Sequence, residues 1–176
     1  MFVKHISNKV AIVGIGNVGA TLAYALTLSG LATEIVLLDR NHYKAEGEAM
    51  DLMHAVPLVR PTRIYAGDYQ DIKGAAITVI TAGSAQKPGE TRLDLAQRNT
   101  DIFKQIIPEI VKNNPDGLLL IASNPVDVLT YLAVKELNLP ASQVIGLGTV
   151  LDTTRLRSML AARLNVPPTQ VNVTIF

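Results

Sequence analysis

Short apolar runs without polar interruption recur along this chain, and they constrain its fold more than any other feature. They cover residues 10–13, 35–38, 75–80, 118–121 and 144–146, and residues 64–65 indicate a minor strand. Runs that are apolar at nearly every position are typical of strands covered on both faces. The pattern therefore predicts a parallel sheet between two layers of other structure.

Helical patterns lie between these runs, over residues 17–30, 43–55, 92–113, 126–138 and 152–164. Regular alternation of strands and helices is the signature of an α/β fold with a doubly wound parallel sheet, the Rossmann arrangement. We expect ligands to bind beyond the carboxyl ends of the strands in such a sheet.

The last residues follow a different pattern. Val171, Val173 and Ile175 alternate with Asn172 and Thr174, which is typical of a half-buried strand in an antiparallel hairpin. We interpret this segment as the opening of a second, incomplete domain. The predicted domains are residues 1–149, which hold the parallel sheet, and residues 150–176.

Charge and composition exclude several classes of protein. Sixteen Lys and Arg residues nearly balance fifteen Asp and Glu residues, which argues against a broad basic surface for nucleic acid. The chain has no cysteine, and no metal site is expected. Neither a signal peptide nor an apolar run of about 20 residues is present, so we expect a cytoplasmic protein without a membrane partner.

A glycine motif, Gly14-x-Gly16-x-x-Gly19, joins the first predicted strand to the first helix. In that context the three glycines permit a tight turn, close approach of a pyrophosphate and close helix packing. Asp39 ends the second strand, 20 residues after Gly19, where a carboxylate can bind the adenosine ribose. The motif predicts NAD rather than NADP as the cofactor, because Asp39 would repel a 2′-phosphate.

Two other interpretations of Asp39 remain open at this point. The side chain could simply cap a turn. Methyltransferases that use S-adenosylmethionine also place an acidic residue after their second strand.

A loop punctuated by proline and glycine follows the fourth strand, over residues 81–92, and Arg92 begins a long helix. A polar loop at this end of the sheet could close over a substrate and exclude water. Composition alone is equally compatible with an ordinary surface loop.

Three further stretches resemble the L-lactate dehydrogenases of the lactate/malate dehydrogenase superfamily. They are residues 81–104, Ser-Asn-Pro-Val-Asp at 123–127, and Leu-Asp-Thr-Thr-Arg-Leu-Arg at 151–157. With the glycine motif they span nearly the whole chain in the family's order. The resemblance implies an NAD-dependent enzyme that interconverts pyruvate and lactate by hydride transfer.

The resemblance also implies roles for residues of the substrate site. Arg92 would polarise the substrate carbonyl, and Gln86 would face the third carbon of the substrate. Asn124 would bond the reacting oxygen beside the nicotinamide, while Arg155 would grip the carboxylate through two hydrogen bonds. Asp152 would orient a catalytic imidazolium. Read locally, Asp152 could instead be a helix N-cap, and the arginines could be solvated charges.

Matching positions of the family suggest further cofactor contacts at Asn17, Val18, Tyr69, Gly83, Ser84, Ala122, Ser123 and Asn124. We also expect a cis peptide bond between Asn124 and Pro125, since proline greatly lowers the cost of the cis form.

The chain departs from the family pattern at the proton-transfer histidine. The family carries it in a Gly-Glu-His-Gly stretch, which would begin directly after Phe176. His5, His42 and His54 are the chain's histidines, and a surface or packing role is expected for each. We therefore expect these 176 residues to be an inactive, cofactor-binding fragment of an enzyme.

Two alternatives to that function remain. A malate dehydrogenase would carry an arginine at position 86 to pair with a second carboxylate, so Gln86 argues against it. A nucleotide-binding module without catalysis is the other alternative.

Regulation is the second departure. Bacterial lactate dehydrogenases that respond to fructose 1,6-bisphosphate use an arginine and a histidine across a subunit interface. Arg157 matches the arginine, but Asn172 stands at the histidine position, and a neutral amide binds phosphate less well. The resemblance implies a dimeric or tetrameric parent enzyme.

Overall fold

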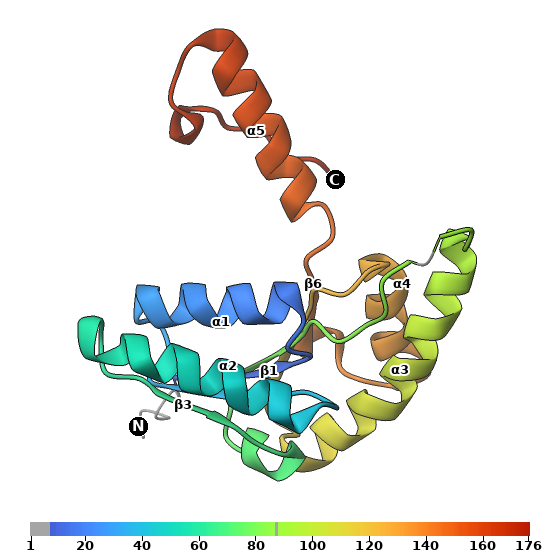
Figure 1. The fold of residues 1–176 in the computed structure, drawn as a ribbon. Coiled ribbons are helices and arrows are strands. Elements are labelled where there is room, and N and C mark those ends of the chain that lie inside the picture. The colour runs from blue at the N-terminus through green and yellow to red at the C-terminus, as the bar shows by residue number, and fades with distance from the viewer. Residues whose placement is uncertain (1–7, 87) are drawn as a thin grey trace, which may run out of the picture.

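The structure is a computed structural model that describes residues 8–86 and 88–176. Six parallel strands form one sheet in the order β3-β2-β1-β4-β5-β6 (Figure 1). The predicted doubly wound sheet is therefore confirmed, and the minor run is a full edge strand. The strands are β1 (Lys9–Val13), β2 (Glu34–Leu38), β3 (Arg63–Ala66), β4 (Ile77–Ile80), β5 (Leu118–Ile121) and β6 (Val144–Gly146).

Five α-helices connect or follow the strands: α1 (Asn17–Ser29), α2 (His42–Ala55), α3 (Arg92–Asn113), α4 (Val126–Tyr131) and α5 (Val150–Leu164). A π-helical turn, η3 (Leu132–Glu136), extends α4. Short 3-10 turns occur at η1 (Val56–Leu58), η2 (Tyr69–Ile72), η4 (Ala141–Gln143) and η5 (Pro168–Gln170). All five predicted helices are thus present. The α4 helix ends seven residues before its predicted end, although η3 continues it to Glu136, and the other boundaries differ by at most two residues.

The sheet is buried on both faces, as its uninterrupted apolar strands predict. On one face Ile12, Ile35 and Leu37 pack against the α1 and α2 side of the molecule. On the other, Val36 and Ile80 contribute to a core with the α3 residues. Phe103, Ile107 and Ile110 form the buried stripe of α3, each at most 1% exposed. Burial at helical spacing therefore holds α3 against the sheet.

Capping residues define the start of α3 and the end of α1. Thr91 and Asp94 form a capping box, in which each side chain accepts from the other residue's backbone N–H. Gly30 ends α1 in the left-handed conformation with φ +63°, a geometry that favours glycine. These local signals define the two helix ends, and the loop that precedes α3 lies at the carboxyl end of the sheet because it follows β4.

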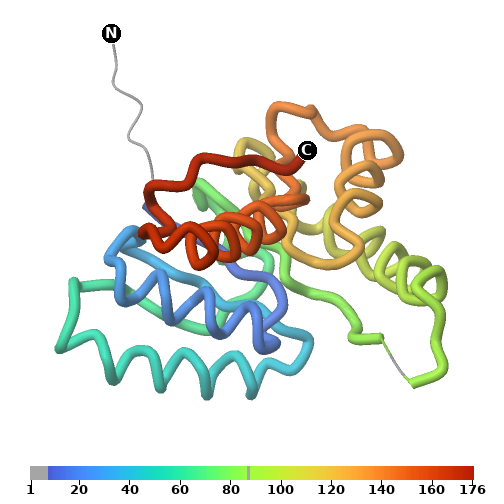
Figure 2. Tube along the Cα trace, turned by 90° about the horizontal axis from the view of Figure 1, so that it is seen from above, coloured from blue at the N-terminus to red at the C-terminus, as the bar shows by residue number. Residues whose placement is uncertain are grey.

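The α5 helix projects away from the sheet (Figure 1), and the final residues return along it, as Figure 2 also shows. Arg157 Nε donates to the carbonyl of Val171 at 2.8 Å. The Ile175 N–H donates to Thr153 Oγ1 at 3.0 Å. These side-chain bonds fasten the C-terminal segment to α5.

The predicted strand over residues 171–175 is wrong, because this segment has no regular secondary structure. Its side chains do alternate between half-buried and exposed, as the sequence indicated. A strand needs a neighbouring strand for its backbone hydrogen bonds. Here the backbone of the segment bonds instead to side chains of α5. Burial therefore alternates along residues 171–175 although no neighbouring strand pairs with them.

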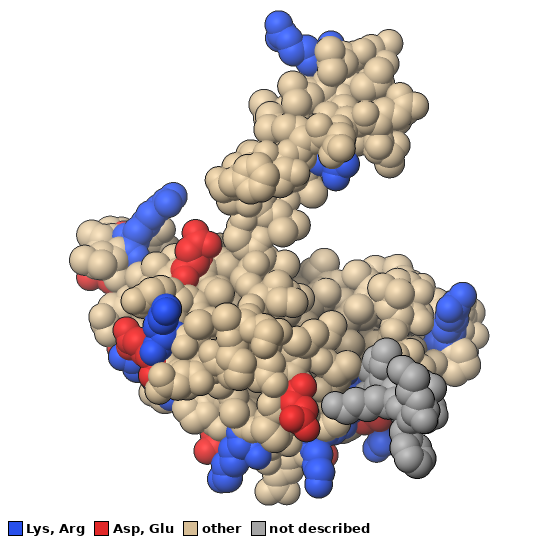
Figure 3. All heavy atoms as spheres, turned by 180° about the vertical axis from the view of Figure 1, so that it is seen from behind, with Lys and Arg blue, Asp and Glu red and all other residues tan. Residues whose placement is uncertain are grey.

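The surface carries charges of both signs. On the face seen in Figure 3, lysines and arginines are scattered among aspartates and glutamates rather than gathered on one broad surface. Across residues 8–86 and 88–176, no helix combines the length and hydropathy that crossing a bilayer requires.

Candidate cofactor and substrate site

A cleft of about 810 Å³ opens at the carboxyl end of the sheet. The ends of β1 and β2, the loop after β4 and one face of α3 supply its walls. This is where the strand order reverses around β1 and β4, the position at which doubly wound sheets bind dinucleotides. Tyr69 borders the cleft, and burial, with a smaller contribution from the charge of Glu109, raises the pKa of its phenol.

The glycine motif forms a tight turn between β1 and α1. Gly14 has φ +100°, and a Cβ on it would collide with the backbone of Ala82. A Cβ on Gly19 would collide with the carbonyl of Gly14. Gly16 differs, because no atom lies within 4 Å of a Cβ built there and the residue borders the cleft. Two glycines therefore permit the turn, and the third leaves open space for a ligand.

Asp39 lies at the end of β2 and is fixed by two backbone donors. The Ile15 N–H donates to Oδ2 at 2.7 Å, and the Asn41 N–H donates to Oδ1 at 2.9 Å. Each carboxylate oxygen has a further lone pair for a ligand hydroxyl. The first turn of α1 has no acidic residue, so its N–H groups can donate to a phosphate without repulsion from a nearby carboxylate. These features fit an NAD-type dinucleotide.

The structure places some predicted cofactor residues in the cleft and others beside it. Gly14, Gly16, Asp39, Tyr69, Gly83 and Ser84 line the cleft. Asn17, Val18, Gly19, Ala122, Ser123 and Asn124 do not line it. Asn17 and Val18 are exposed at the start of α1, and Ser123 is buried.

Sequence reasoning missed several lining residues. Arg40, Asn41 and Lys44 stand at the Asp39 end of the cleft, and Ile102, Gln105 and Ile106 present one face of α3. Helical spacing singled out Ile102 and Ile106, but it does not tell which side of a helix meets a ligand, and no sequence pattern singled out Arg40 or Asn41.

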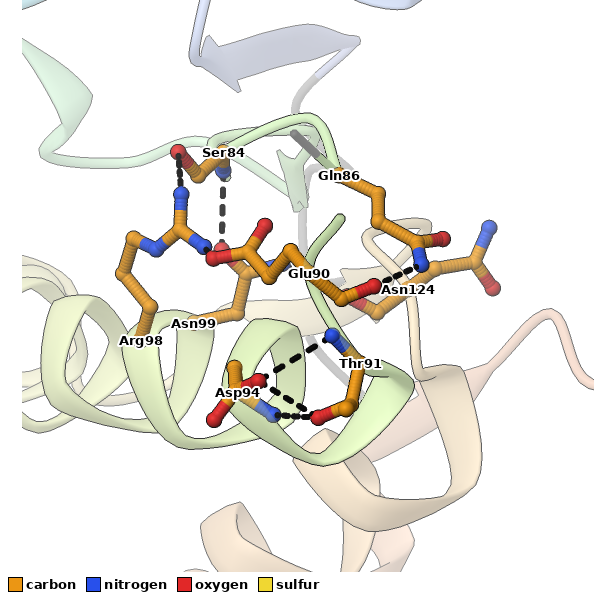
Figure 4. Close-up of polar contacts among 8 residues, drawn as sticks. All are labelled: Ser84, Gln86, Glu90, Thr91, Asp94, Arg98, Asn99 and Asn124. Atoms are coloured by element: carbon orange, nitrogen blue, oxygen red, sulfur yellow. Dashed lines mark hydrogen bonds and ion pairs between the residues drawn. The ribbon is translucent and has the colours of Figure 1, made fainter. Parts of the chain in front are cut away.

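The loop after β4 is held by consecutive residues of α3 (Figure 4). Asn99 Oδ1 accepts the Ser84 N–H at 2.8 Å, and Asn99 Nδ2 donates to the Asn124 carbonyl at 2.7 Å. Arg98 donates to Ser84 Oγ at 3.1 Å and forms an ion pair with Glu90. This set of bonds, which sequence reasoning also missed, fixes the loop against the helix.

Gln86 and Arg92, two predicted substrate residues, are exposed on or beside this loop. Gln86 Nε2 donates to the Glu90 carbonyl at 2.7 Å (Figure 4), which orients its amide within the loop. Arg92 is the first residue of α3. Asn124 follows β5, and the peptide bond between Asn124 and Pro125 is cis, which confirms that prediction.

The substrate residues predicted on α5 lie elsewhere. Arg155 pairs with Asp152 at 3.0 Å, and both side chains are more than half exposed. None of the five predicted substrate residues borders the cleft. The α5 helix, which carries Asp152 and Arg155, stands clear of the sheet in Figure 1, so this pair lies apart from Gln86, Arg92 and Asn124. Thr149 occupies the N-cap of α5, so the local interpretation of Asp152 as an N-cap is wrong.

The remaining candidates are also outside the cleft. His42 and His54 lie near the two ends of α2, both exposed, and His42 approaches Glu46 at 3.3 Å. His5 lies outside the described residues. Asn172 is exposed next to Val171, which Arg157 holds. Within the described ranges, no group of three metal-ligating side chains occurs.

Comparison with known proteins identifies relatives of the chain. Residues 8–146 match the model of the family described as lactate/malate dehydrogenase, NAD binding domain. An L-lactate dehydrogenase of Clostridium botulinum is 55% identical over 175 residues, which are 99% of this chain and 55% of that protein. One from Thermoanaerobacterium saccharolyticum is 54% identical over 165 residues, covering 94% and 53%.

Solved structures agree with the sequence relatives. A minor L-lactate dehydrogenase from Enterococcus mundtii, in its ligand-bound form, superposes with a TM-score of 0.92 at 47% identity, covering 97% of this chain and 55% of that one. A lactate dehydrogenase from a deep-sea metagenome gives 0.88 at 49% identity, covering 93% and 52%. The chain thus spans about half the length of the relatives it matches.

Proposed function

The chain belongs to the lactate/malate dehydrogenase family and contains its NAD-binding domain, and on this premise we propose that it is part of an L-lactate dehydrogenase. The observation that carries the proposal is the cleft itself. It combines an open cradle at Gly16 and a carboxylate at Asp39 with a loop that carries Gln86. The relatives named as L-lactate dehydrogenases support the same activity.

The chain's residues would hold the two ends of NAD differently. Asp39 would accept the adenosine ribose hydroxyls, and the amides of Asn17 and Val18 would bind the pyrophosphate. Ser84 and Asn124 would lie at the nicotinamide end. NAD, when bound, supplies the acceptor, and in reduced form the donor, of the hydride that interconverts lactate and pyruvate.

Substrate recognition would come from the loop and from α5. Arg92 would polarise the keto oxygen, Asn124 would donate to it, and Gln86 would face the methyl group of pyruvate. Arg155 would bind the carboxylate once it is released from Asp152, because planar guanidinium matches a carboxylate with two bonds. Asp152 would then be available to stabilise a protonated imidazole.

We further propose that a polypeptide of these 176 residues binds NAD without reducing pyruvate at enzymatic rates. Its histidines, His5, His42 and His54, precede Asp152 in the chain, and the two described ones are exposed on α2. A positioned acid–base group typically contributes about 10²–10⁴-fold to such a step. The proposal also holds that the complete enzyme is a homodimer or homotetramer.

A second candidate is a nucleotide-binding module without catalysis. The mutual pairing of Asp152 and Arg155, away from the cleft, favours it. A malate dehydrogenase is not favoured, since neutral Gln86 offers no partner for a second carboxylate.

Calorimetric titration of the chain with NADH tests the cofactor site. Gly16→Val should weaken binding at least about tenfold, because the side chain fills the pyrophosphate cradle. Gly47→Val on α2 is the matched control, since a Cβ there also meets no atom within 4 Å but the residue lies outside the cleft. Equal effects of the two variants would contradict the assignment of the cradle.

Activity separates the two candidate functions. The chain alone should oxidise NADH with pyruvate only at background rate, and a separately produced second half of a lactate dehydrogenase should restore turnover. Restored turnover that Asp152→Ala or Arg155→Ala abolishes would support the dehydrogenase. Binding of NADH with no turnover in the reconstituted complex would favour the module.

Fructose 1,6-bisphosphate is expected not to activate the complete enzyme. Arg157 already donates to the Val171 carbonyl, and Asn172 provides no positive charge. Turnover measured with and without the sugar bisphosphate checks this expectation, and clear activation would refute it.

A further inference from the structure

Asn99 is a buried polar residue in the first half of α3, the helix that follows the loop after β4. Its side chain is on α3 and the residue is only 2% exposed. The amide uses both of its ends, since Oδ1 accepts from the Ser84 N–H at 2.8 Å and Nδ2 donates to the Asn124 carbonyl at 2.7 Å. A buried amide with satisfied bonds specifies one arrangement of its partners, because leaving either bond unmade is costly.

Asn99 thereby joins two loops that the sheet alone does not join. Ser84 belongs to the loop after β4, and Asn124 belongs to the loop after β5 (Figure 4). Gly83 packs closely on the same amide, because a Cβ on it would lie 3.3 Å from Asn99 Nδ2. A second bond also joins the two loops, because the Ser123 hydroxyl donates to the Ala82 carbonyl at 2.6 Å.

The loop after β4 lines the cleft through Gly83 and Ser84, and the loop after β5 lies beside it, both on the side of β1 away from β2 and Asp39. Asp39 fixes the adenosine end at β2, and a dinucleotide extends from there across the switch point toward β4 and β5. The nicotinamide end must therefore lie against the loops that Asn99 joins.

We propose that Asn99 is a positioning residue, which sets Ser84 and Asn124 in the relative placement that the nicotinamide end of the cofactor requires. The inference rests on the proposed function, and it adds a residue that touches neither cofactor nor substrate. Replacing Asn99 should therefore weaken binding of the nicotinamide end of the cofactor and leave binding of the adenosine end unchanged.

The chain offers a closely matched control in Asn114. This second buried asparagine caps α3, and its side chain also makes one bond of each kind to backbone. Oδ1 accepts the Gly74 N–H at 3.2 Å, and Nδ2 donates to the Ala75 carbonyl at 2.8 Å. These bonds lie just before β4 begins, at the amino ends of the strands, whereas the cleft lies at their carboxyl ends.

Binding of NADH and of ADP-ribose, which lacks the nicotinamide ring, tests the proposal by calorimetry. The unmodified chain should bind NADH more tightly than ADP-ribose. Asn99→Ala should reduce that ratio by about tenfold, the value of one or two lost hydrogen bonds, with little change for ADP-ribose. Asn114→Ala should lower thermal stability to a similar degree and leave the ratio unchanged.

Asn99→Asp separates the two bonds. The introduced carboxylate keeps an acceptor for the Ser84 N–H but faces the Asn124 carbonyl without a proton. The ratio should fall at neutral pH and recover as the pH is lowered and the carboxyl becomes a donor. The deficit of Asn99→Ala should stay constant with pH, since alanine has nothing to titrate.

Amide hydrogen exchange gives a readout that does not depend on ligand. The Ser84 N–H should exchange faster in Asn99→Ala, while β4 amides keep their protection, and Asn114→Ala should not affect Ser84. Unchanged Ser84 exchange, or equal loss of the binding ratio in both alanine variants, would overturn the positioning role. A chain that bound neither NADH nor ADP-ribose would overturn the proposed function instead, and exchange would still judge Asn99.

Discussion

At the scale of single residues, the carboxylate of Asp39 is bonded to the fold and would bind the cofactor in the proposed function. Two backbone N–H groups, from Ile15 and Asn41, hold its oxygens, so the side chain is oriented before any cofactor arrives. Such preorganisation reduces the entropy that binding would otherwise lose. Arg40 and Lys44, which also line this end of the cleft, place positive charge close to that carboxylate.

Asp39→Ala should weaken NADH binding by about tenfold or more, because hydrogen bonds to a charged group are lost. The preference for NADH over NADPH should shrink, since a 2′-phosphate no longer meets a negative charge and Arg40 and Lys44 remain. Titration with both reduced cofactors measures the ratio. Asp51→Ala, which removes the same charge from α2, should leave the ratio unchanged, and an unmodified chain that prefers NADPH would contradict the assignment.

Gln86 is the residue expected to select the substrate. In the complete enzyme, Gln86→Arg should raise kcat/KM for oxaloacetate relative to pyruvate by about 10–100-fold, because the guanidinium can pair with the second carboxylate. Gln70→Arg adds the same charge on an exposed turn and should not change the ratio. If the two variants behaved alike, Gln86 would not face the substrate.

Thr78 is a buried polar residue that lowers the stability of the fold. Its hydroxyl, fully buried on β4, has no hydrogen-bond partner among the described residues. Thr78→Val should raise the free energy of unfolding by about 1 kcal/mol, since an unpaired polar group leaves the core. Thr27→Val should lower it by a similar amount, because that buried hydroxyl donates to the Ala23 carbonyl at 2.8 Å. Denaturant unfolding compares them, and destabilisation by both would contradict the prediction.

At the scale of elements, polar side chains join β1, β2 and β3 near the amino ends of these strands. Lys9 pairs with Glu34 at 3.0 Å, and Tyr65 donates to the same Glu34 oxygen at 2.7 Å. The guanidinium of Arg63 stacks 4.5 Å from the centre of the Tyr65 ring. The Tyr65 hydrogen bond, with Lys9 and Arg63, lowers the pKa of Glu34 despite partial burial.

This network should make stability depend on pH in the acid range. A carboxyl whose pKa is lower in the folded state stabilises the fold above its ordinary value of 4.5 and loses that effect as pH falls through the lowered value. Glu34→Gln should therefore cost about 1 kcal/mol at neutral pH and progressively less in acid. Urea unfolding at several pH values measures the difference, which Tyr65→Phe should reduce; a pH-independent difference would argue against the network.

At the scale of the whole molecule, the sheet and α5 are loosely connected. The α5 helix contacts η5, within its own C-terminal segment, more than any strand of the sheet, and it stands clear of the sheet in Figure 1. Several large apolar side chains of α5, such as Leu151 and Met159, are more than half exposed. Much of the apolar surface of α5 is therefore exposed rather than packed on the sheet.

Removing residues 150–176 should therefore leave the sheet and the cofactor cleft intact. We expect the midpoint of thermal unfolding to change by less than about 4 °C, the shift that about 1 kcal/mol produces at this size. NADH affinity should stay within about twofold. A chain that ends at residue 143 also loses β6, which pairs with β5, and should be clearly less stable. A large loss of stability on removing α5 alone would contradict the predicted domain boundary.

The sequence by itself determined the sheet, the order of its elements and the glycine turn with Asp39. Each of these depends on local patterns: apolar runs, helical spacing, and the conformations that glycine and proline permit. The tertiary structure alone decided that Asn99 joins Ser84 to Asn124, that Lys44 and Gln105 face the cleft, and that residues 171–176 bond to α5 rather than form a strand. Those outcomes depend on which groups meet across distant parts of the chain. A short-range pattern records a preference for burial or extension, but the partner that satisfies each buried hydrogen bond is set only when the chain has folded.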